Sequence, residues 1–431
     1  MIAPDTRGPA PLTGLVAVMV LVAVVAGGVL LTTFSGDPTS GAGGEQDTPA
    51  TSPASRGAGD EGLSESQRAL AATRALIDLE QGVRTAREDV FDRAFAADPE
   101  SAQAGDDIFT SLTRLPLSTY SMRYIGEVSH EADTWAADVS VQWGLRGVDR
   151  RAVTNEVEVT FTEEGPGDVA RVVSMEAGSQ EQTPIWLLGR LQTQQVGPAL
   201  VLSLQSPLTE GVADQTRRAV RDVRRVLTGW DGGLVVVLPE TSAQLEELLA
   251  ADEGAYDSIA AVTASADGTS DPTAPVRVVL NPPVFLGLGP IAGQVVLSHE
   301  ATHAATGATY RDMPLWLVEG FGDYVALAGE PVPLEVAAGQ ALDSVRESGP
   351  PDELPTEGDF STEAHGLGAS YEAAWLACRL IAQEYGQDTL LKFYRVVSRS
   401  GDVDAAFERV LGTTEEDFTD EWRDYLLELA E

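Results

Sequence analysis

The chain has 431 residues, of which 67 are acidic and 28 basic, and its formal net charge is −39. Binding to nucleic-acid phosphate requires clusters of basic residues, so we expect no nucleic acid partner. The single cysteine, Cys378, excludes an intrachain disulfide, and its spacing among apolar neighbours predicts a small buried residue that is not a nucleophile.

The N-terminus predicts a membrane anchor. Residues 12–32 carry no charge, and about 20 apolar residues suffice to cross a bilayer as a helix. Arg7 precedes this run, so the positive-inside rule places residues 1–11 in the cytoplasm and the rest of the chain outside the cell. A signal peptide cleaved near Ala26 is the alternative, although the apolar run is longer than a usual signal core.

Residues 33–62 predict a linker. They consist mostly of Gly, Ser, Thr, Pro and Ala with scattered acids. Such a composition cannot bury enough apolar surface to fold, so we expect a disordered stalk. The anchor and this linker would hold the remaining chain at the outer surface of the cell membrane as a single-pass protein.

Residues 63–183 predict an α+β domain that begins with helices. Ser64 is suited to cap the first helix, and apolar residues recur behind it at helical spacing. The positions expected to face the core are Leu70, Ile77, Leu79, Val83 and Val90.

From Tyr120 the period changes to the alternation of antiparallel strands, in four runs at residues 118–130, 134–147, 152–164 and 169–178. Helices followed by a curved antiparallel sheet resemble the NTF2-like cone fold in pattern. His130 is expected in a turn, and no acid–base constellation stands out. Because such folds host enzymes, ligand pockets and interaction modules alike, we expect a spacer, substrate-recruiting or regulatory domain.

Residues 184–431 predict a second α+β region, with a small sheet and a mostly helical C-terminal part. Strands are expected within residues 198–208, 232–240, 258–265 and 274–284, and helices at 213–230 and 242–253. After Gly329 we expect helices, interrupted by a loop at residues 349–369.

The stretch LSHEATHAATG holds two of the four histidines of the chain. Pro290 and Gly307 predict a helix start and a helix end, which would place His299 and His303 one turn apart on one face, where two imidazoles can bind one metal ion. Glu300 points about 100° around the axis and can hold a water without being a ligand. The alternative is a helix with two incidental histidines.

A catalytic zinc ion needs a third protein ligand, which we expect in the next helix. Asp312 and Pro314 signal the start of this helix. Glu319 lies in its middle among apolar residues, where a lone carboxylate is costly unless it is paired or binds a metal. Asp323 lies one turn later on the same face and is suited to accept a hydrogen bond from the far nitrogen of a histidine ligand. The alternatives are a surface glutamate and a solvated aspartate.

The pair HEATH and WLVEGFGDYVA resembles the gluzincin metallopeptidases. Within them it is similar to the bacterial peptidase MA-like group, which pairs HExxH with a W-L-x-E-G-x-A-x-Y helix. The resemblance implies that His299, His303 and Glu319 bind Zn2+ and that Glu300 is the general base. Gly322 stands where the group usually has alanine, which is a change between two small residues.

Residues 369–386 predict a helix and resemble the Tyr-Glu-Lys-Gly helix of the aminopeptidase and leukotriene-hydrolase branch of the gluzincins. There a tyrosine hydroxyl donates to the tetrahedral oxyanion, a role that the resemblance would give to Tyr371. Two alanines replace the Lys-Gly of that branch, and a core aromatic is the alternative for Tyr371. His365, in a Gly-rich loop, is the rival donor.

Together these features predict a membrane-anchored, extracytoplasmic zinc metallopeptidase that acts on a peptide or protein substrate. The resemblance implies a thermolysin-like domain at residues 184–431. A strand ahead of the HExxH helix would let an extended peptide pair along a sheet edge. The alternative is an envelope binding or scaffold protein that keeps the fold with little or no turnover, and whose NTF2-like domain binds a ligand.

Overall fold

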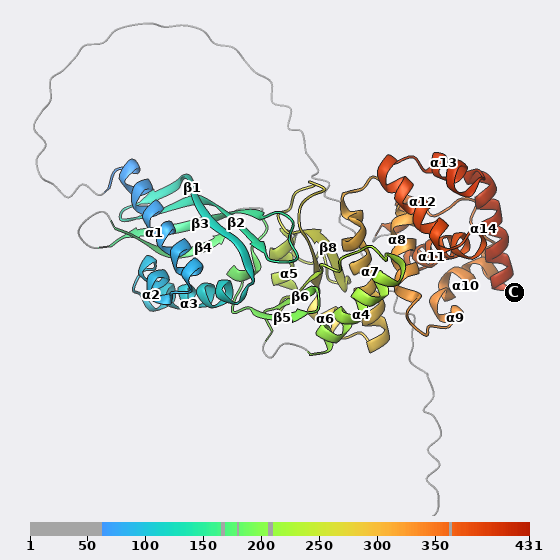
Figure 1. The fold of residues 1–431 in the computed structure, drawn as a ribbon, viewed down its shortest axis with the longest axis horizontal. Coiled ribbons are helices and arrows are strands. Elements are labelled where there is room, and N and C mark those ends of the chain that lie inside the picture. The colour runs from blue at the N-terminus through green and yellow to red at the C-terminus, as the bar shows by residue number, and fades with distance from the viewer. Residues whose placement is uncertain (1–62, 165–168, 179–180, 206–209, 362–363) are drawn as a thin grey trace, which may run out of the picture.

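A computed structural model describes residues 63–164, 169–178, 181–205, 210–361 and 364–431 (Figure 1). The predicted anchor at residues 12–32 and the predicted linker at residues 33–62 lie outside these described residues. No helix in the described part of the chain is long and apolar enough to cross a membrane. The described residues form a mixed α+β fold, as expected, with a four-stranded and a five-stranded sheet.

Helices precede the first sheet, as predicted. They are α1 (Glu65–Thr85), α2 (Glu88–Phe91), the short turn η1 (Asp92–Ala94) and α3 (Pro99–Arg114). Ser64 is the N-cap of α1, and its backbone N–H donates to the side-chain oxygen of Gln67 at 3.0 Å. This bond satisfies a backbone donor at the helix start, which explains why the helix begins here.

The predicted core face of α1 is wrong in part. Leu79 and Val83 are buried, and so is Val90 in α2, but Leu70 and Ile77 are 53% and 54% exposed. The stripe that α1 turns inward is rich in small residues: Ala71, Ala72 and Ala75, with Leu76. Small side chains let the helix axis lie close to the sheet, and this rotation carries the two larger residues to the solvent side.

The four predicted strands of the first sheet are confirmed. They are β1 (Leu117–Glu131), β2 (Thr134–Leu145), β3 (Val153–Glu163) and β4 (Ala170–Ala177), and they pair antiparallel in the order β1-β2-β3-β4. The prediction that His130 lies in a turn is wrong, because β1 continues through it and pairs it with Trp135. The reversal comes after it, where Ala132 has a φ of 51°.

The second sheet is mixed, in the order β5-β6-β7-β9-β8. Its strands are β5 (Gln192–Val196), β6 (Ala199–Ser203), β7 (Val235–Leu238), β8 (Ala261–Ser265) and β9 (Val276–Leu280). β6, β7 and β9 run parallel, whereas β5 and β8 are antiparallel edge strands. Four of these strands were expected from sequence; β5, with three glutamines in five residues, was not.

The helices of the second region are α4 (Glu210–Val226), α5 (Ser242–Leu249), α6 (Pro282–Phe285), α7 (Pro290–Thr306), α8 (Leu315–Leu327), α9 (Leu334–Ala337), α10 (Gly339–Ser348), α11 (Leu367–Glu384), α12 (Gln387–Ser400), α13 (Val403–Ala406) and α14 (Glu415–Ala430). The short 3-10 turns are η2 (Ile185–Leu187), η3 (Ala308–Tyr310) and η4 (Glu357–Phe360), and η5 (Phe407–Leu411) is a π-helical segment. The predicted helical C-terminal part is confirmed. The loop predicted at residues 349–369 contains the turn η4, and it ends earlier than expected because α11 begins at Leu367.

The five-stranded sheet is shared by two hydrophobic cores, and it lies between the first sheet and the C-terminal helices in Figure 1. Side chains of alternate residues point to opposite faces of a strand. One face joins the core beneath the four-stranded sheet through residues such as Leu202, Val237 and Val279. The other face joins the core of the helices through Val201 and Val278, among others.

Ion pairs also cross between the two regions. Arg277 in β9 donates two hydrogen bonds of 2.8 Å to the carboxylate of Asp149, in the loop between β2 and β3. The two side chains are 7% and 3% exposed. From the same loop, Arg151 binds Asp267 at 2.9 Å. The predicted boundary at residues 183–184 falls just before η2, where the chain passes from one sheet to the other.

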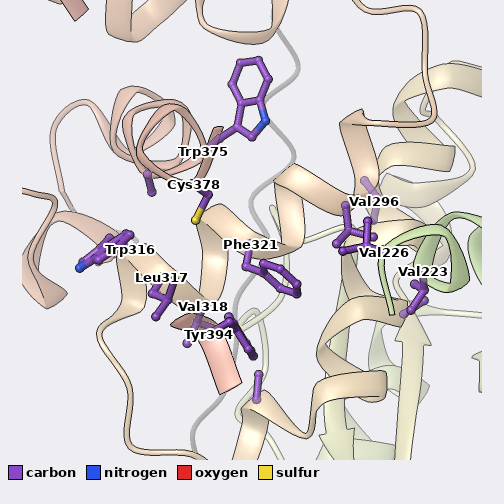
Figure 2. Close-up of a cluster of buried hydrophobic side chains, with 14 of the residues drawn as sticks. Val223, Val226, Val296, Trp316, Leu317, Val318, Phe321, Trp375, Cys378 and Tyr394 are labelled. Carbon is purple, nitrogen blue, oxygen red and sulfur yellow. The ribbon is translucent and has the colours of Figure 1, made fainter. Parts of the chain in front are cut away.

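The hydrophobic core of the C-terminal helices is centred on α8. Figure 2 shows Trp316, Leu317, Val318 and Phe321 of this helix among buried side chains of α4, α7, α11 and α12. The ring of Phe321 stacks on Tyr394 of α12, with centroids 4.3 Å apart. Cys378 of α11 is buried in this core, as predicted. This packing fixes α8 on several sides, and the same helix carries a predicted metal ligand.

Candidate metal centre

The helix that carries the HExxH stretch has the predicted ends. α7 begins at Pro290 and ends at Thr306, and Gly307 closes it in the left-handed conformation with a φ of 66°. Glycine adopts this conformation without a steric penalty, and its N–H donates to the carbonyl of His303. His299 and His303 are each 1% exposed, and their rings meet edge to face with centroids 4.5 Å apart. Both imidazoles therefore lie inside the protein on one face of the helix.

Glu319 of α8 joins these two histidines. Its Oε2 atom is 3.1 Å from Nε2 of His299 and 3.6 Å from Nε2 of His303, and the two nitrogens are 2.7 Å apart. All three donor atoms lie within 4.8 Å of one another, and all three residues are buried. The two helices thus bring together the three residues that were predicted as metal ligands, and this buried cluster could bind a metal ion.

The donor set fits a tetrahedral metal ion. Nitrogen and oxygen ligands lie about 2.0–2.2 Å from Zn²⁺, so two ligands of one tetrahedral ion are roughly 3.3 Å apart. The observed distances of 2.7, 3.1 and 3.6 Å lie on both sides of this value. Two imidazole nitrogens cannot face each other at 2.7 Å with both lone pairs bare, so they share either a proton or a cation. Imidazole and carboxylate donors in this number suit a divalent transition metal.

The charges of the cluster are strongly coupled. Burial by itself lowers the pKa of His299, but the carboxylates of Asp323 and Glu319 outweigh it and raise this pKa well above its usual value. Burial by itself raises the pKa of Glu319, but His303 and His299 outweigh it and lower this pKa. Glu319 is therefore an ionised buried carboxylate, which needs positive charge next to it.

Asp323 and Gly322 hold the ring of His299 from behind. Oδ1 of Asp323 lies 2.7 Å from Nδ1 of His299. A hydrogen bond there keeps a proton on Nδ1, so that Nε2 is the ring nitrogen that faces the cluster. A Cβ atom on Gly322 would lie 2.8 Å from Cε1 of His299. The glycine that departs from the resembled pattern is therefore in direct contact with a ligand ring, and an alanine would have to displace that ring.

Glu300 is completely buried and is not among the three converging ligands. Its Oε2 atom accepts a hydrogen bond of 2.5 Å from the hydroxyl of Thr263 in β8. Its Oε1 atom makes no hydrogen bond within the described residues. Burial raises the pKa of Glu300, and His303, His299 and Thr263 partly oppose that rise. A carboxylate with one open oxygen beside a metal site is suited to accept a proton.

The two predicted oxyanion donors lie in different surroundings. Tyr371 of α11 is 6% exposed, and its ring meets Phe360 edge to face at 5.1 Å. Burial raises the pKa of Tyr371 well above its usual value, and so do the nearby carboxylates of Glu319, Asp323 and Glu300. The tyrosine therefore lies within the field of the cluster and keeps its hydroxyl proton.

His365 is exposed in the segment before α11. It makes no hydrogen bond or ion pair within the described part of the chain, and the metal ligands do not include it. The structure thus brings Tyr371, but not His365, into the buried surroundings of the cluster.

Sequence reasoning missed two polar contacts of α7. Thr263 lies between a valine and an alanine in β8, and such a short strand carries no signal of contact with a helix distant in sequence. On another side of α7, Ser298 donates to the buried carboxylate of Asp222 in α4 at 3.0 Å, and Gln294 donates to Ser298 at 2.9 Å. These bonds fix the rotation of α7 about its axis, and with it the direction of both histidines.

Neither a scan against protein-family models nor a search of curated proteins found a match for this chain.

Proposed function

We propose that the chain is a zinc metallopeptidase of the gluzincin type, anchored in the cell membrane by residues 12–32. The observation that carries the proposal is the convergence of His299, His303 and Glu319 beside the unligated carboxylate of Glu300. Three ligands with one acid–base group next to them are the parts that hydrolysis by a metal-activated water requires. The substrate would be a peptide or protein outside the cytoplasm.

Each side chain has a separate role in this proposal. When bound, zinc would supply a Lewis acid that polarises a water and the scissile carbonyl. Glu300 accepts a proton from the attacking water at its open oxygen and passes it to the leaving amine. Tyr371 donates its hydroxyl proton in a hydrogen bond to the developing oxyanion, which is where electrostatic stabilisation is largest. Asp323 holds His299 in the tautomer that ligation needs.

The arrangement of elements supports the finer fold proposals. In the second region an edge strand, β8, contacts the helix with the HExxH stretch, and the next long helix supplies the third ligand. We propose a thermolysin-like fold for this region, in which an extended substrate pairs along the sheet edge. In the first region, helices precede a four-stranded antiparallel sheet and pack on it, and we propose an NTF2-like fold.

The test compares the full-length chain with Glu300→Gln. Metal content is measured by plasma mass spectrometry, and a broad peptide library is digested at neutral pH. We expect about one zinc ion per chain in both proteins, since Glu300 is not a ligand. Cleavage by the variant should fall by about 10²–10⁴-fold, which is the usual contribution of a general base.

Other outcomes favour other functions. Bound zinc without any cleavage that depends on Glu300 would support the envelope scaffold, in which the site is structural. Two histidines and one carboxylate also hold Fe(II) in oxygenases. Iron as the stoichiometric metal, with no peptide cleavage, would therefore contradict the hydrolase proposal.

A further inference from the structure

We propose that Thr263 is a positioning residue that orients the carboxylate of Glu300 for proton transfer. This inference rests on the proposed function, in which Glu300 is the general base. Thr263 lies in the edge strand β8 and is completely buried, like Glu300 in α7. Its hydroxyl is the hydrogen-bond donor to that carboxylate within the described residues.

The hydrogen bond makes the two carboxylate oxygens of Glu300 different. Oε2 accepts from Thr263 at 2.5 Å, and Oε1 has no partner within the described residues. A carboxylate on a side chain with several rotatable bonds loses rate if it is free to turn, because proton transfer needs a defined donor–acceptor geometry. By fixing Oε2, Thr263 leaves Oε1 as the oxygen that accepts the proton.

A second contact of the Thr263 hydroxyl raises the alternative that its role is purely structural. The hydroxyl of Thr263 also lies 3.1 Å from the backbone carbonyl of Glu300, so it could serve only to tie β8 to α7. A hydroxyl has one proton, however, and the shorter contact is to the side-chain carboxylate. The geometry therefore assigns the proton to the carboxylate.

The first test uses Thr263→Val, which keeps the shape of the side chain and removes the hydroxyl, and Thr263→Ser, which keeps the hydroxyl. Thr216→Val is the matched control, since Thr216 is equally buried and its hydroxyl donates to Val212 within α4 at 2.7 Å. Thr263→Val should keep its zinc and lose about 10–10²-fold in kcat, with KM changed by less than about threefold. Thr263→Ser should recover most of kcat, and Thr216→Val should match the wild type.

Wild-type kcat in Thr263→Val would overturn the proposal. So would loss of zinc in that variant, or a serine variant as impaired as the valine variant. A wild type without Glu300-dependent cleavage would instead refute the proposed function, and a second measurement then decides the role of Thr263.

The second measurement is the melting temperature of the metal-free full-length chain. It compares wild type, Thr263→Val, Glu300→Met and the double variant. Either single change removes the same hydrogen bond. The shift in melting temperature of the double variant should therefore differ by about 2 °C or more from the sum of the two single shifts. The shifts in melting temperature caused by Thr216→Val and Glu300→Met should be additive. Additive shifts for Thr263 and Glu300, within about 1 °C, would show that Thr263 does not hold the carboxylate.

Discussion

At the scale of single residues, the ring of His299 in the candidate metal centre is held by neighbours that are outside the cluster. Asp323 and Gly322 belong to α8, the helix that also supplies Glu319, and both contact the ring of His299 in α7. If the cluster binds an ion as proposed, the donor atom of His299 is already in place, and little side-chain entropy would be lost on binding. This placement is why changes outside the ligand set should alter metal affinity.

We expect His303→Ala to abolish stoichiometric zinc binding, because two remaining ligands hold zinc weakly. Asp323→Ala should keep the site but weaken zinc affinity by about 10–100-fold, since the tautomer and tilt of His299 are no longer fixed. Titration with a competing chelator measures both effects. Asp343→Ala, on the exposed side of α10, is the control and should bind like the wild type. Full zinc content in His303→Ala would contradict the assignment of the site.

Substitutions of Tyr371 and His365, the two candidate oxyanion donors, should affect turnover differently. Tyr371→Phe should retain zinc and lower turnover by about 10–10³-fold, because it removes a hydroxyl donor without removing the buried ring. His365→Ala should leave turnover unchanged, since this side chain lies outside the buried cluster. Steady-state kinetics on one cleaved peptide measures both variants. The reverse pattern would make His365 the donor and Tyr371 a core aromatic.

At the scale of elements, the site depends on how closely α8 approaches its neighbours. A Cβ atom on Gly320 would lie 2.6 Å from the backbone carbonyl carbon of Ala374 in α11 and 3.1 Å from the sulfur of Cys378. The two helices therefore touch backbone to backbone one residue after Glu319. On the opposite side, Gly322 contacts the ring of His299 in α7. Two glycines on one helix thus allow α8 to lie between the helix of the histidines and the helix of Tyr371.

We expect Gly320→Ala to separate α8 from α11. The overpacking should lower the free energy of unfolding by about 1–3 kcal/mol, even though alanine favours helix more than glycine does. Denaturant unfolding of the metal-free chain measures this loss. Gly339→Ala is the matched control, because a Cβ there meets nothing within 4 Å, and it should be neutral or slightly stabilising. Equal stability of the two variants would show that the close approach is not needed.

At the scale of the whole molecule, both faces of the five-stranded sheet are covered by other parts of the described chain. One face covers the core of the first region, and the other supports α4 and α7, on which α8 packs in turn. The buried pair of Arg277 and Asp149 lies at the same interface. Removing the first region would uncover a row of aliphatic side chains and remove the carboxylate partner of Arg277, so that a large apolar face of the sheet would be exposed to water.

We therefore expect residues 184–431 to be insoluble or to unfold without cooperativity when expressed alone. Residues 63–431 should be soluble and unfold cooperatively, since they keep both faces of the sheet covered. Circular dichroism during heating, together with gel filtration, measures the difference. A soluble and cooperative fragment of residues 184–431 would mean that the first region is an accessory to the fold.

The proposed anchor predicts where the full-length chain is found. It should sediment with the membrane fraction, and protease added outside intact cells should remove the folded region, because residues beyond the anchor lie outside. A variant that lacks residues 1–32 should no longer sediment with the membrane fraction. Recovery from the culture medium of a mature chain that begins near Gly27 would show that the apolar run is a cleaved signal.

The sequence by itself determined the features that depend on local periodicity. Helical spacing placed His299 and His303 one turn apart, and the end residues of α7 followed from proline and glycine preferences that act within one turn. Strand alternation predicted β1 to β4, because side chains on successive residues point to opposite faces. These are properties of neighbouring residues, so they can be read without knowing what packs against them.

Only the tertiary structure decided which side of an element is covered and which distant groups meet. The inward face of α1 is its alanine stripe because the sheet comes close to the helix, and local spacing cannot distinguish that stripe from Leu70 and Ile77. Thr263 reaches Glu300 only because β8 ends the sheet beside α7. Contacts between residues far apart in sequence depend on the packing of whole elements, and that packing is set by the shared core.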